Sequence, residues 1–387
     1  MSLVATALLG AGGLVATGVV AELIARLGLR RFGGYFPLVP HQRQRFELDR
    51  EALPMLEPVV HWSVNKDGER GGEVPRGAAR YLLAGGSCVE SYYLDQPSSV
   101  AGQLQAELSA THGGRPVHVG SVARSRISCA QIREMLSKSY GLEAHANHRA
   151  NGGRGPKPFE AVILMVGASD LVRWFELGAP TEPWTDEAPL SHLFGQHPEG
   201  PFGWTPGRLA LRALAARAQR RFFPREELRT RVGKRLVELR RARAAAEPKL
   251  DTIADPTLML ERFGKELGAL IDDLKCVTDR VVVARQPWFD KELTPDEERW
   301  MWNFGQGEIY AGGVKTYFSH RLVRELMRKV ANRAGEVARA HGAIDLDTPS
   351  ELEPSLDNFY DFLHFTPAGA KRVAELVTRC LPSPVRS

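Results

Sequence analysis

Three side chains that are far apart in the sequence could act together as a nucleophile, a base and an orienting carboxylate. Ser87 follows an apolar run that ends in Gly85-Gly86, and Asp361 stands three residues before His364. A serine hydroxyl becomes a nucleophile when a base takes its proton, and the imidazole that does so needs a carboxylate to fix its tautomer. These residue types therefore predict acyl transfer at Ser87, with His364 as base and Asp361 as orienter.

Alternating apolar and amphipathic segments predict the scaffold that would bring these residues together. Strands are expected over residues 79–84, 116–119, 159–166, 280–284 and 343–346, and helices over 98–111, 127–140, 317–339 and about 367–380. Apolar strands that alternate with helices are typical of a parallel sheet covered on both faces. We therefore predict an α/β fold, a flavodoxin-like three-layer sandwich with a five-stranded parallel sheet, with its site at the carboxyl ends of the strands.

The segment after the fifth strand explains why one loop would carry both the base and its carboxylate. Thr366 and Pro367 follow His364 closely and are typical of an N-cap and a first helical position. A helix that begins there would fix the preceding loop at the same sheet edge as Ser87.

Four short blocks of sequence resemble the SGNH, or GDSL-like, hydrolase superfamily, and in particular bacterial members with an N-terminal membrane anchor. They are Gly85-Gly86-Ser87, Gly120, Gly167-Ala168-Ser169-Asp170 (usually G-x-N-D in the family) and Asp361-Phe362-Leu363-His364 (D-x-x-H). The resemblance covers most of residues 1–170 and 279–380. It implies a serine hydrolase with a Ser-His-Asp triad.

The same resemblance implies an oxyanion hole. Backbone N–H groups of Ser87 or Cys88 and of Gly120 would hold the oxyanion, and Ser169 stands where the family has an asparagine that donates from its side chain. A hydroxyl can donate but reaches differently, and the loss of one such donor typically costs about 3 kcal/mol in rate terms.

The amino terminus predicts a membrane anchor over residues 1–31. No charged residue occurs from Ser2 to Ala21, and 20 residues rise roughly 30 Å as a helix, about the thickness of the hydrocarbon core. A cleaved signal peptide and a buried amino-terminal helix are the alternatives. The arginines that follow, at positions 26, 30 and 31, favour a cytoplasmic domain. The resemblance to anchored envelope proteins favours a periplasmic, extracytoplasmic domain, which we expect.

Two further segments complete the expected domain organisation. Residues 32–78 read as an irregular juxtamembrane segment with one short strand near 59–64, before a hydrolase domain over 79–387. An insertion at about 171–278 separates the third and fourth strands, and its middle, 208–249, has 14 Lys/Arg and four acidic residues. One or two basic amphipathic helices are expected there, either as a solvated insertion or in contact with anionic lipid or an acidic polymer.

Composition narrows the function classes. The net charge of +5 over 387 residues does not indicate nucleic-acid binding. The four cysteines lack a C-x-x-C pair and no histidine has metal-ligand spacing, so neither a metal nor a cofactor is expected. The sequence predicts an esterase acting on an acylated small molecule, glycan or lipid. An O-acetyltransferase with the same triad and a catalytically silent domain that binds a glycan or a partner are the alternatives.

Overall fold

A five-stranded parallel sheet forms the centre of the protein in the computed structural model, which describes residues 3–151, 156–198, 209–246, 249–307, 313–314 and 316–381. Its strands, in spatial order, are β10 (Ile344–Leu346), β7 (Val281–Ala284), β5 (Ala161–Met165), β3 (Ala79–Gly85) and β4 (Val117–Ala123). Every neighbouring pair is parallel. All residues of β5 and β7 are buried, because both faces of the sheet are covered. The predicted five-stranded α/β fold is confirmed.

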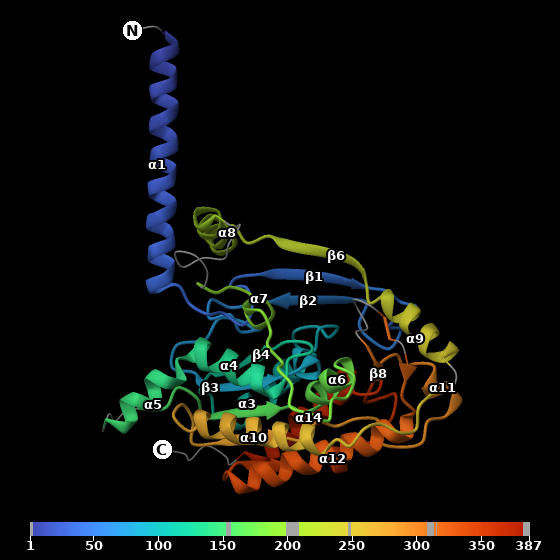
Figure 1. Ribbon diagram of the computed structural model, residues 1–387. Helices are drawn as coiled ribbons and strands as arrows, with labels where there is room; N and C mark the ends of the chain where they lie inside the picture. Colours follow the sequence, from blue (N-terminus) through green and yellow to red (C-terminus); the bar gives the residue numbers. More distant parts are fainter. Residues whose placement is uncertain are drawn as a thin grey trace.

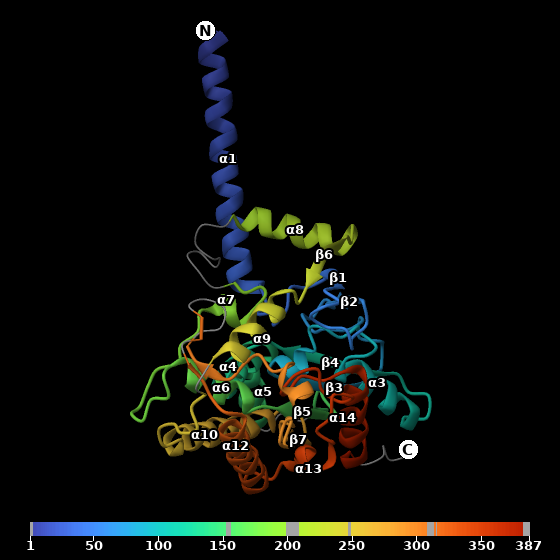
Figure 2. The same cartoon turned by 90° about the vertical axis from the view of Figure 1, so that its right-hand side faces the viewer.

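Helices cover both faces of this sheet. Figure 2 shows α3 (Val100–Thr111) and α14 (Pro367–Cys380) on one side, and α4 (Cys129–Tyr140), α10 (Thr257–Leu274) and α12 (His320–Ala340) on the other. Helix α12 buries apolar residues at helical spacing, and α14 begins at Pro367 after Thr366, whose hydroxyl accepts a hydrogen bond from the Gly369 N–H. The three-layer arrangement and the start of the last helix are therefore as expected.

Short elements connect these layers. They are α2 (Ser87–Glu90), α5 (Leu142–Ala150), α6 (Ala168–Glu176), α7 (Leu190–Leu193), α11 (Pro295–Glu298), α13 (Thr348–Glu351) and the strand pair β8 (Gly305–Gln306) and β9 (Thr316–Tyr317). Helices α2 and α6 begin directly after β3 and β5, so their first turns lie at the carboxyl edge of the sheet.

A second, three-stranded sheet corrects two expectations. Strand β2 (Val59–Ser63) is the short strand expected near 59–64, but β1 (Arg43–Leu48) lies in a stretch expected to be irregular, and β6 (Glu226–Val232) lies in the insertion expected to be helical. Strand β1 pairs with β2 antiparallel and with β6 parallel. Six of the seven residues of β6 are exposed, so no apolar alternation marks it, and its pairing with β1 defines it. Among the described residues, the basic middle of the insertion, 208–249, otherwise contains the helices α8 (Ala210–Phe222) and α9 (Arg235–Ala245), as expected.

The first helix, α1 (Leu3–Phe32), projects away from the rest of the molecule (Figure 1). Among the described residues, the stretch from Gly12 to Arg31 has a mean hydropathy of 1.5 over 20 residues, with 6% of the most apolar part buried. It is therefore long and apolar enough to cross a membrane. Helix α8 lies beside the carboxyl-terminal part of α1, where Leu29 packs on Ala210.

Candidate active site

Two glycines deliver Ser87 to the carboxyl edge of the sheet. A Cβ atom on Gly85 would lie 2.4 Å from the Met165 carbonyl oxygen, and one on Gly86 would lie 2.5 Å from the Ser169 hydroxyl. Only glycine permits β3 to pass so close to the end of β5 and the start of α6. Ser87 then opens α2, partly exposed, in the first turn of a short helix.

Ser87, His364 and Asp361 form a continuous chain of hydrogen bonds. The Ser87 Oγ lies 2.7 Å from the His364 Nε2. The His364 Nδ1 lies 2.7 Å from Oδ2 and 3.0 Å from Oδ1 of Asp361. Each distance is within the range for a nucleophile, its base and an orienting carboxylate. The structure thus brings Ser87 into contact with a pair of residues that lies more than 270 positions later in the sequence.

The Asp361 carboxylate is completely buried and has several donors. Its Oδ1 accepts from the backbone N–H groups of Leu363 and His364, each at 2.9 Å, which tightens the D-x-x-H segment into a turn. Its Oδ2 accepts from the Trp302 indole N–H at 2.7 Å. Burial opposes the charge, but the His364 imidazole and these N–H donors outweigh it and hold the pKa of Asp361 below its ordinary value.

The basic insertion supports this arrangement from a distance. On α9, Arg240 donates to the Trp300 carbonyl at 3.2 Å and Arg243 donates to the Asn303 carbonyl at 3.0 Å. These bonds hold the segment on both sides of Trp302, whose indole contacts Asp361. Sequence reasoning missed the contact between Trp302 and Asp361 and this contribution of the insertion, because the contacts join segments about 60 residues apart.

A small cavity of about 130 Å³ adjoins Ser87 and His364. Aromatic side chains form much of its wall, and α9 contributes one apolar residue; the lining includes Tyr92, Tyr93, Ser125, Arg126, Ala168, Ser169, Val172, Leu236, Trp302, Asn303, Tyr360 and Leu363. The ring of Tyr360 lies 5.5 Å from the His364 ring and nearly parallel to it. A cavity of about 150 Å³ accepts a molecule the size of benzene, so this one suits a small group.

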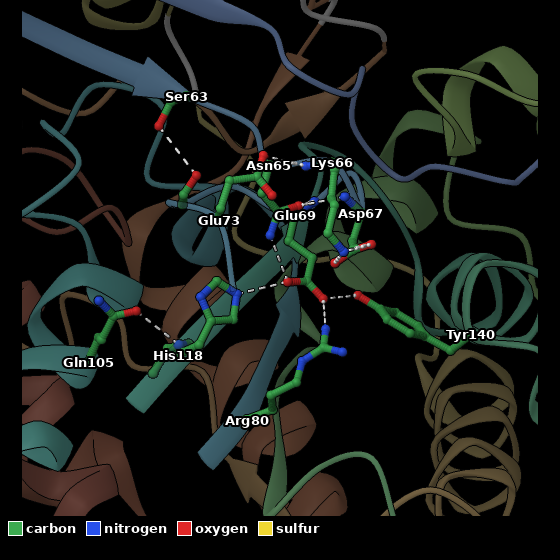
Figure 3. Close-up of polar contacts among 12 residues, drawn as sticks. Ser63, Asn65, Lys66, Asp67, Glu69, Glu73, Arg80, Gln105, His118 and Tyr140 are labelled. Atoms are coloured by element: carbon green, nitrogen blue, oxygen red, sulfur yellow. Dashed lines mark hydrogen bonds and ion pairs between the residues drawn. The ribbon is translucent and has the colours of Figure 1, made fainter. Parts of the chain in front are cut away.

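Gly120 does not reach this cavity, which corrects its expected place in the oxyanion hole. It lies inside β4, paired with Leu82, whereas the end of the strand is marked by Ala123 opposite Gly85. A Cβ on Gly120 would lie 2.5 Å from the carboxylate of Glu69. That carboxylate is buried among His118, Arg80 and Tyr140 (Figure 3). The glycine therefore makes room for that carboxylate.

Ser125 and Arg126 occupy the place expected for Gly120 at the sheet edge. Both follow β4 and line the cavity beside Ser87. Arg126 has a φ of 63°, a left-handed conformation more usual for glycine, and its guanidinium lies 2.8 Å from the Glu176 carboxylate. A glycine would have marked this positive φ in the sequence, but the residue here is arginine, so the sequence gives no sign of the turn.

The other two expected oxyanion residues do lie near Ser87. Ser169 lines the cavity from the first turn of α6. Cys88 follows Ser87 in α2, and the N–H groups of a helix's first turn have no partner within the helix. The Cys88 thiol points away into the core, where it donates to the Leu363 carbonyl at 3.2 Å and burial raises its pKa well above the ordinary value. Cys88 is therefore suited to bind an oxyanion through its backbone N–H and not through its thiol.

Asp170, in the third sequence block Gly167-Ala168-Ser169-Asp170, bonds to the start of a neighbouring helix. Its Oδ1 accepts from the Cys129 N–H at 3.0 Å and so satisfies the start of α4. Burial raises the pKa of Asp170 to about 7. In the described part of the chain, no group of three or more His, Cys, Asp or Glu side chains could hold a metal ion.

Comparisons with known proteins return solved structures only. No family model matches the chain, and no curated protein matches it. The chain is similar to LAE5, an alpha/beta hydrolase enzyme from the metagenome of Lake Arreo, at 14% identity, covering 79% of this chain and 98% of that one with a TM-score of 0.40. It is similar to Axe2, an acetylxylan esterase from Geobacillus stearothermophilus, at 11% identity, covering 81% and 100% with a TM-score of 0.40. It is also similar to a protein from Parabacteroides merdae described as a GDSL-like lipase, at 9% identity, covering 80% and 97% with a TM-score of 0.41.

Proposed function

We propose that the protein is a membrane-anchored serine esterase of the SGNH type, with Ser87 as nucleophile, His364 as base and Asp361 as orienting carboxylate. The observation that carries the proposal is the pair of 2.7 Å contacts, Ser87 Oγ to His364 Nε2 and His364 Nδ1 to Asp361 Oδ2, beside a small cavity.

The proposed reaction passes through an acyl-enzyme. His364 takes the hydroxyl proton while the Ser87 oxygen bonds to the acyl carbon, which leaves a negative charge on the carbonyl oxygen. The N–H groups of Ser87 and Cys88 donate to that oxygen, and the Ser169 hydroxyl is placed to assist. The ester C–O bond then breaks and His364 gives its proton to the departing alcohol. Water, activated by the same imidazole, releases the acid.

The size of the cavity favours a short acyl group such as acetyl. A volume of about 130 Å³ beside Ser87 and His364 fits a group of this size. Tyr92, Tyr93 and Trp302 contribute flat, apolar walls that also offer polar edges, a combination that suits the ring of a sugar. We therefore propose an acetylated glycan of the cell envelope as substrate.

The aromatic wall also favours a second candidate, an O-acetyltransferase. A sugar hydroxyl would then replace water and receive the acetyl group from Ser87, with His364 taking its proton. The two activities differ in product: only the transferase forms an acetylated sugar when an oligosaccharide is added to an activated acetyl ester.

Hydrolysis of p-nitrophenyl acetate by the full-length protein in detergent tests the enzymatic proposal. The Ser87→Ala variant is expected to lose at least ~10⁴-fold in kcat, as removal of a serine nucleophile generally does. Labelling by a fluorophosphonate at Ser87, absent in His364→Ala, would support the same assignment. Equal turnover by wild type and Ser87→Ala, or no turnover of any short ester, would leave a catalytically silent binding domain instead.

Helix α1 is proposed to remain as an anchor and not to be cleaved. Its Glu22 carboxylate accepts hydrogen bonds from the Ala210 and Leu211 N–H groups, at 2.7 and 3.0 Å, and its Leu29 packs on Ala210. A cleaved leader would not be expected to make such contacts with the mature domain.

The catalytic domain is proposed to face the periplasmic, extracytoplasmic side. The resemblance to anchored envelope proteins supports this orientation, against the arginines that follow the span. Fusion of alkaline phosphatase at the carboxyl terminus is expected to give activity, and a fused green fluorescent protein is expected to stay dark. The opposite pair of results would place the domain in the cytoplasm.

A further inference from the structure

Helix α8 exposes apolar side chains that nothing in the described chain covers. The exposed fractions are 41% for Leu211, 37% for Leu214 and 66% for Phe222, and Phe223 just beyond the helix is 73% exposed. The opposite face of α8 packs on the protein through Ala210 and Ala213, which lie against α1. Helix α8 therefore places small apolar residues against the protein and larger apolar residues toward its surroundings.

Helix α8 also carries positive charge. Its 13 residues contain four arginines, at positions 212, 217, 220 and 221, and no acidic residue. Arg212 and Arg221 are exposed, whereas Arg217 lies over the Phe36 ring and Arg220 donates to the Pro40 carbonyl, both toward the domain. In the described part of the chain, none of these arginines forms an ion pair with a carboxylate. Burial and the neighbouring Arg221 lower the pKa of Arg217, and burial and Arg217 lower that of Arg220, as expected of cations without a counter-charge. The cluster therefore lacks an anion.

A cavity beneath α8 extends this positive surface. Its volume is about 370 Å³, and Arg220 and Arg221 line it together with His41, Arg43 and Lys66. Glu73 is the one carboxylate in its lining, and it lies 3.6 Å from His41. A phosphate group that approached α8 from outside would meet cations on the helix and in this cavity.

The position of α8 relative to α1 indicates what the anion belongs to. In Figures 1 and 2, α1 projects from the domain. Helix α8 lies beside the base of α1 and across its direction, on the side of the molecule from which α1 leaves. The contact is made by Glu22, which is the first charged residue after the apolar run from Ser2 to Ala21. Glu22 would mark the membrane boundary if α1 spans a bilayer, so α8 begins at that boundary.

We propose that α8 lies in the surface of a bilayer rich in anionic phospholipid, with its apolar side chains among the upper acyl chains and its exposed arginines, Arg212 and Arg221, on the lipid phosphates. An interfacial helix of this kind combines an apolar face with basic residues that reach the headgroups. Together with α1 it fixes the height and tilt of the cavity beside Ser87 relative to the membrane. The proposal depends on α1 as an anchor and does not depend on esterase activity.

The test uses the full chain with one reporter on α8. Phe222→Cys, in a Cys380→Ser background that leaves only buried native thiols, is labelled with an environment-sensitive fluorophore. The protein is reconstituted into liposomes of phosphatidylcholine alone or with about a third phosphatidylglycerol, a content that gives a negative surface potential. Lipids that carry a nitroxide in the upper acyl chain report contact. Quenching is expected in the anionic liposomes, and added salt is expected to reduce it.

Charge variants separate lipid docking from mere proximity. Arg212→Gln with Arg221→Gln is expected to weaken docking of α8 roughly thirtyfold, since each basic side chain near an anionic surface contributes about 1 kcal/mol. The matched control removes two exposed arginines at the far side of the domain, Arg321→Gln with Arg372→Gln, and is expected to leave quenching unchanged.

Flotation of the protein with the liposomes after alkaline carbonate extraction measures the insertion of α1 separately. Insertion without quenching, or quenching that is equal in neutral liposomes and in both double variants, overturns the proposal while the anchor stands. Failure to float overturns the anchor and the docking together. If the reporter on α8 becomes shielded in detergent as the protein concentration rises, the exposed face of α8 contacts a second copy of the chain. That result also overturns the proposal.

Discussion

In the described part of the chain, two histidines contact a fully buried carboxylate, and only one of these pairs adjoins a serine hydroxyl. At the candidate site, Asp361 contacts His364 at 2.7 Å, and inside the domain Glu69 contacts His118 at 2.9 Å (Figure 3). Both carboxylate side chains are fully buried, and both have a pKa below the ordinary value despite the burial that opposes it. Proximity of the two groups is therefore not what distinguishes a catalytic pair.

The difference lies in the other donors to each carboxylate. Glu69 accepts from Arg80 at 2.8 Å, as well as from Asn65 and Tyr140, so a guanidinium already balances its charge. The donors described for Asp361 besides His364 are an indole and two backbone N–H groups, which are neutral. In the proposed mechanism, the charge of Asp361 is thus available to the imidazolium that would form when His364 takes a proton. The difference between the two pairs is that Glu69 is bonded to a guanidinium, whereas the described donors to Asp361 besides His364 are neutral.

Removing each histidine should have opposite consequences, and this is the largest effect expected. His364→Ala should lower kcat for p-nitrophenyl acetate by roughly 10⁴-fold, because the base is lost, with little change in unfolding free energy. His118→Ala should leave kcat per folded molecule unchanged and lower the unfolding free energy by about 3 kcal/mol, because a buried charge loses one partner. Steady-state kinetics and urea denaturation in detergent measure both. A large kcat loss in His118→Ala at full stability would make the two pairs equivalent and contradict the distinction.

Gly120→Ala tests the structural pair alone. The added Cβ would lie 2.5 Å from the Glu69 carboxylate, inside a packed core, so the unfolding free energy should fall by about 2–3 kcal/mol. The kcat of the folded fraction should not change, since Gly120 is remote from the cavity. Gly72→Ala, at a glycine with open space around it, is the matched control. A tenfold drop in kcat without loss of stability would restore Gly120 to the oxyanion hole.

Asp170 extends the comparison to a buried carboxylate with no cation bonded to it. Its pKa of about 7 means that the folded state keeps a proton that the unfolded state releases near pH 4, so stability is lost as pH rises through this interval. Between pH 5 and pH 7 the unfolding free energy of the wild type should fall by roughly 2 kcal/mol relative to Asp170→Asn. Urea denaturation at several pH values checks this. Parallel stability curves for the two proteins would show that Asp170 is ionised throughout.

The central sheet could be predicted from the sequence because its strands are buried on both faces and read as apolar runs. The residues at their ends followed from the same pattern, which is why Ser87 and Asp361-x-x-His364 meet as expected. Gly120 was misplaced because the second strand was expected to end at residue 119, where glycine and serine interrupt the apolar run. Strand β4 continues to Ala123, so that glycine lies within the strand and faces Glu69.

The contacts that could not be predicted join segments distant in sequence through the backbone or through one side chain. Strand β6 is held to β1 by backbone pairing and has mostly exposed residues, so no periodicity marks it. Trp302 reaches Asp361 across 59 residues by a single indole N–H. A tryptophan in a loop gives no local signal of such a partner, although its indole N–H is one of the donors to the Asp361 carboxylate.

Trp302→Phe probes that donor directly and should have the smallest effect of the four. The substitution keeps an aromatic ring in the cavity wall but removes the N–H that contacts Asp361 at 2.7 Å. Trp302 is a positioning residue, so kcat should fall about tenfold, the loss expected for one hydrogen bond to a charged group, with KM nearly unchanged. Trp300→Phe, which alters the neighbouring ring stacked on Arg240 but no donor to Asp361, is the matched control. Unchanged kcat and KM in Trp302→Phe would show that the two backbone N–H groups suffice to hold Asp361.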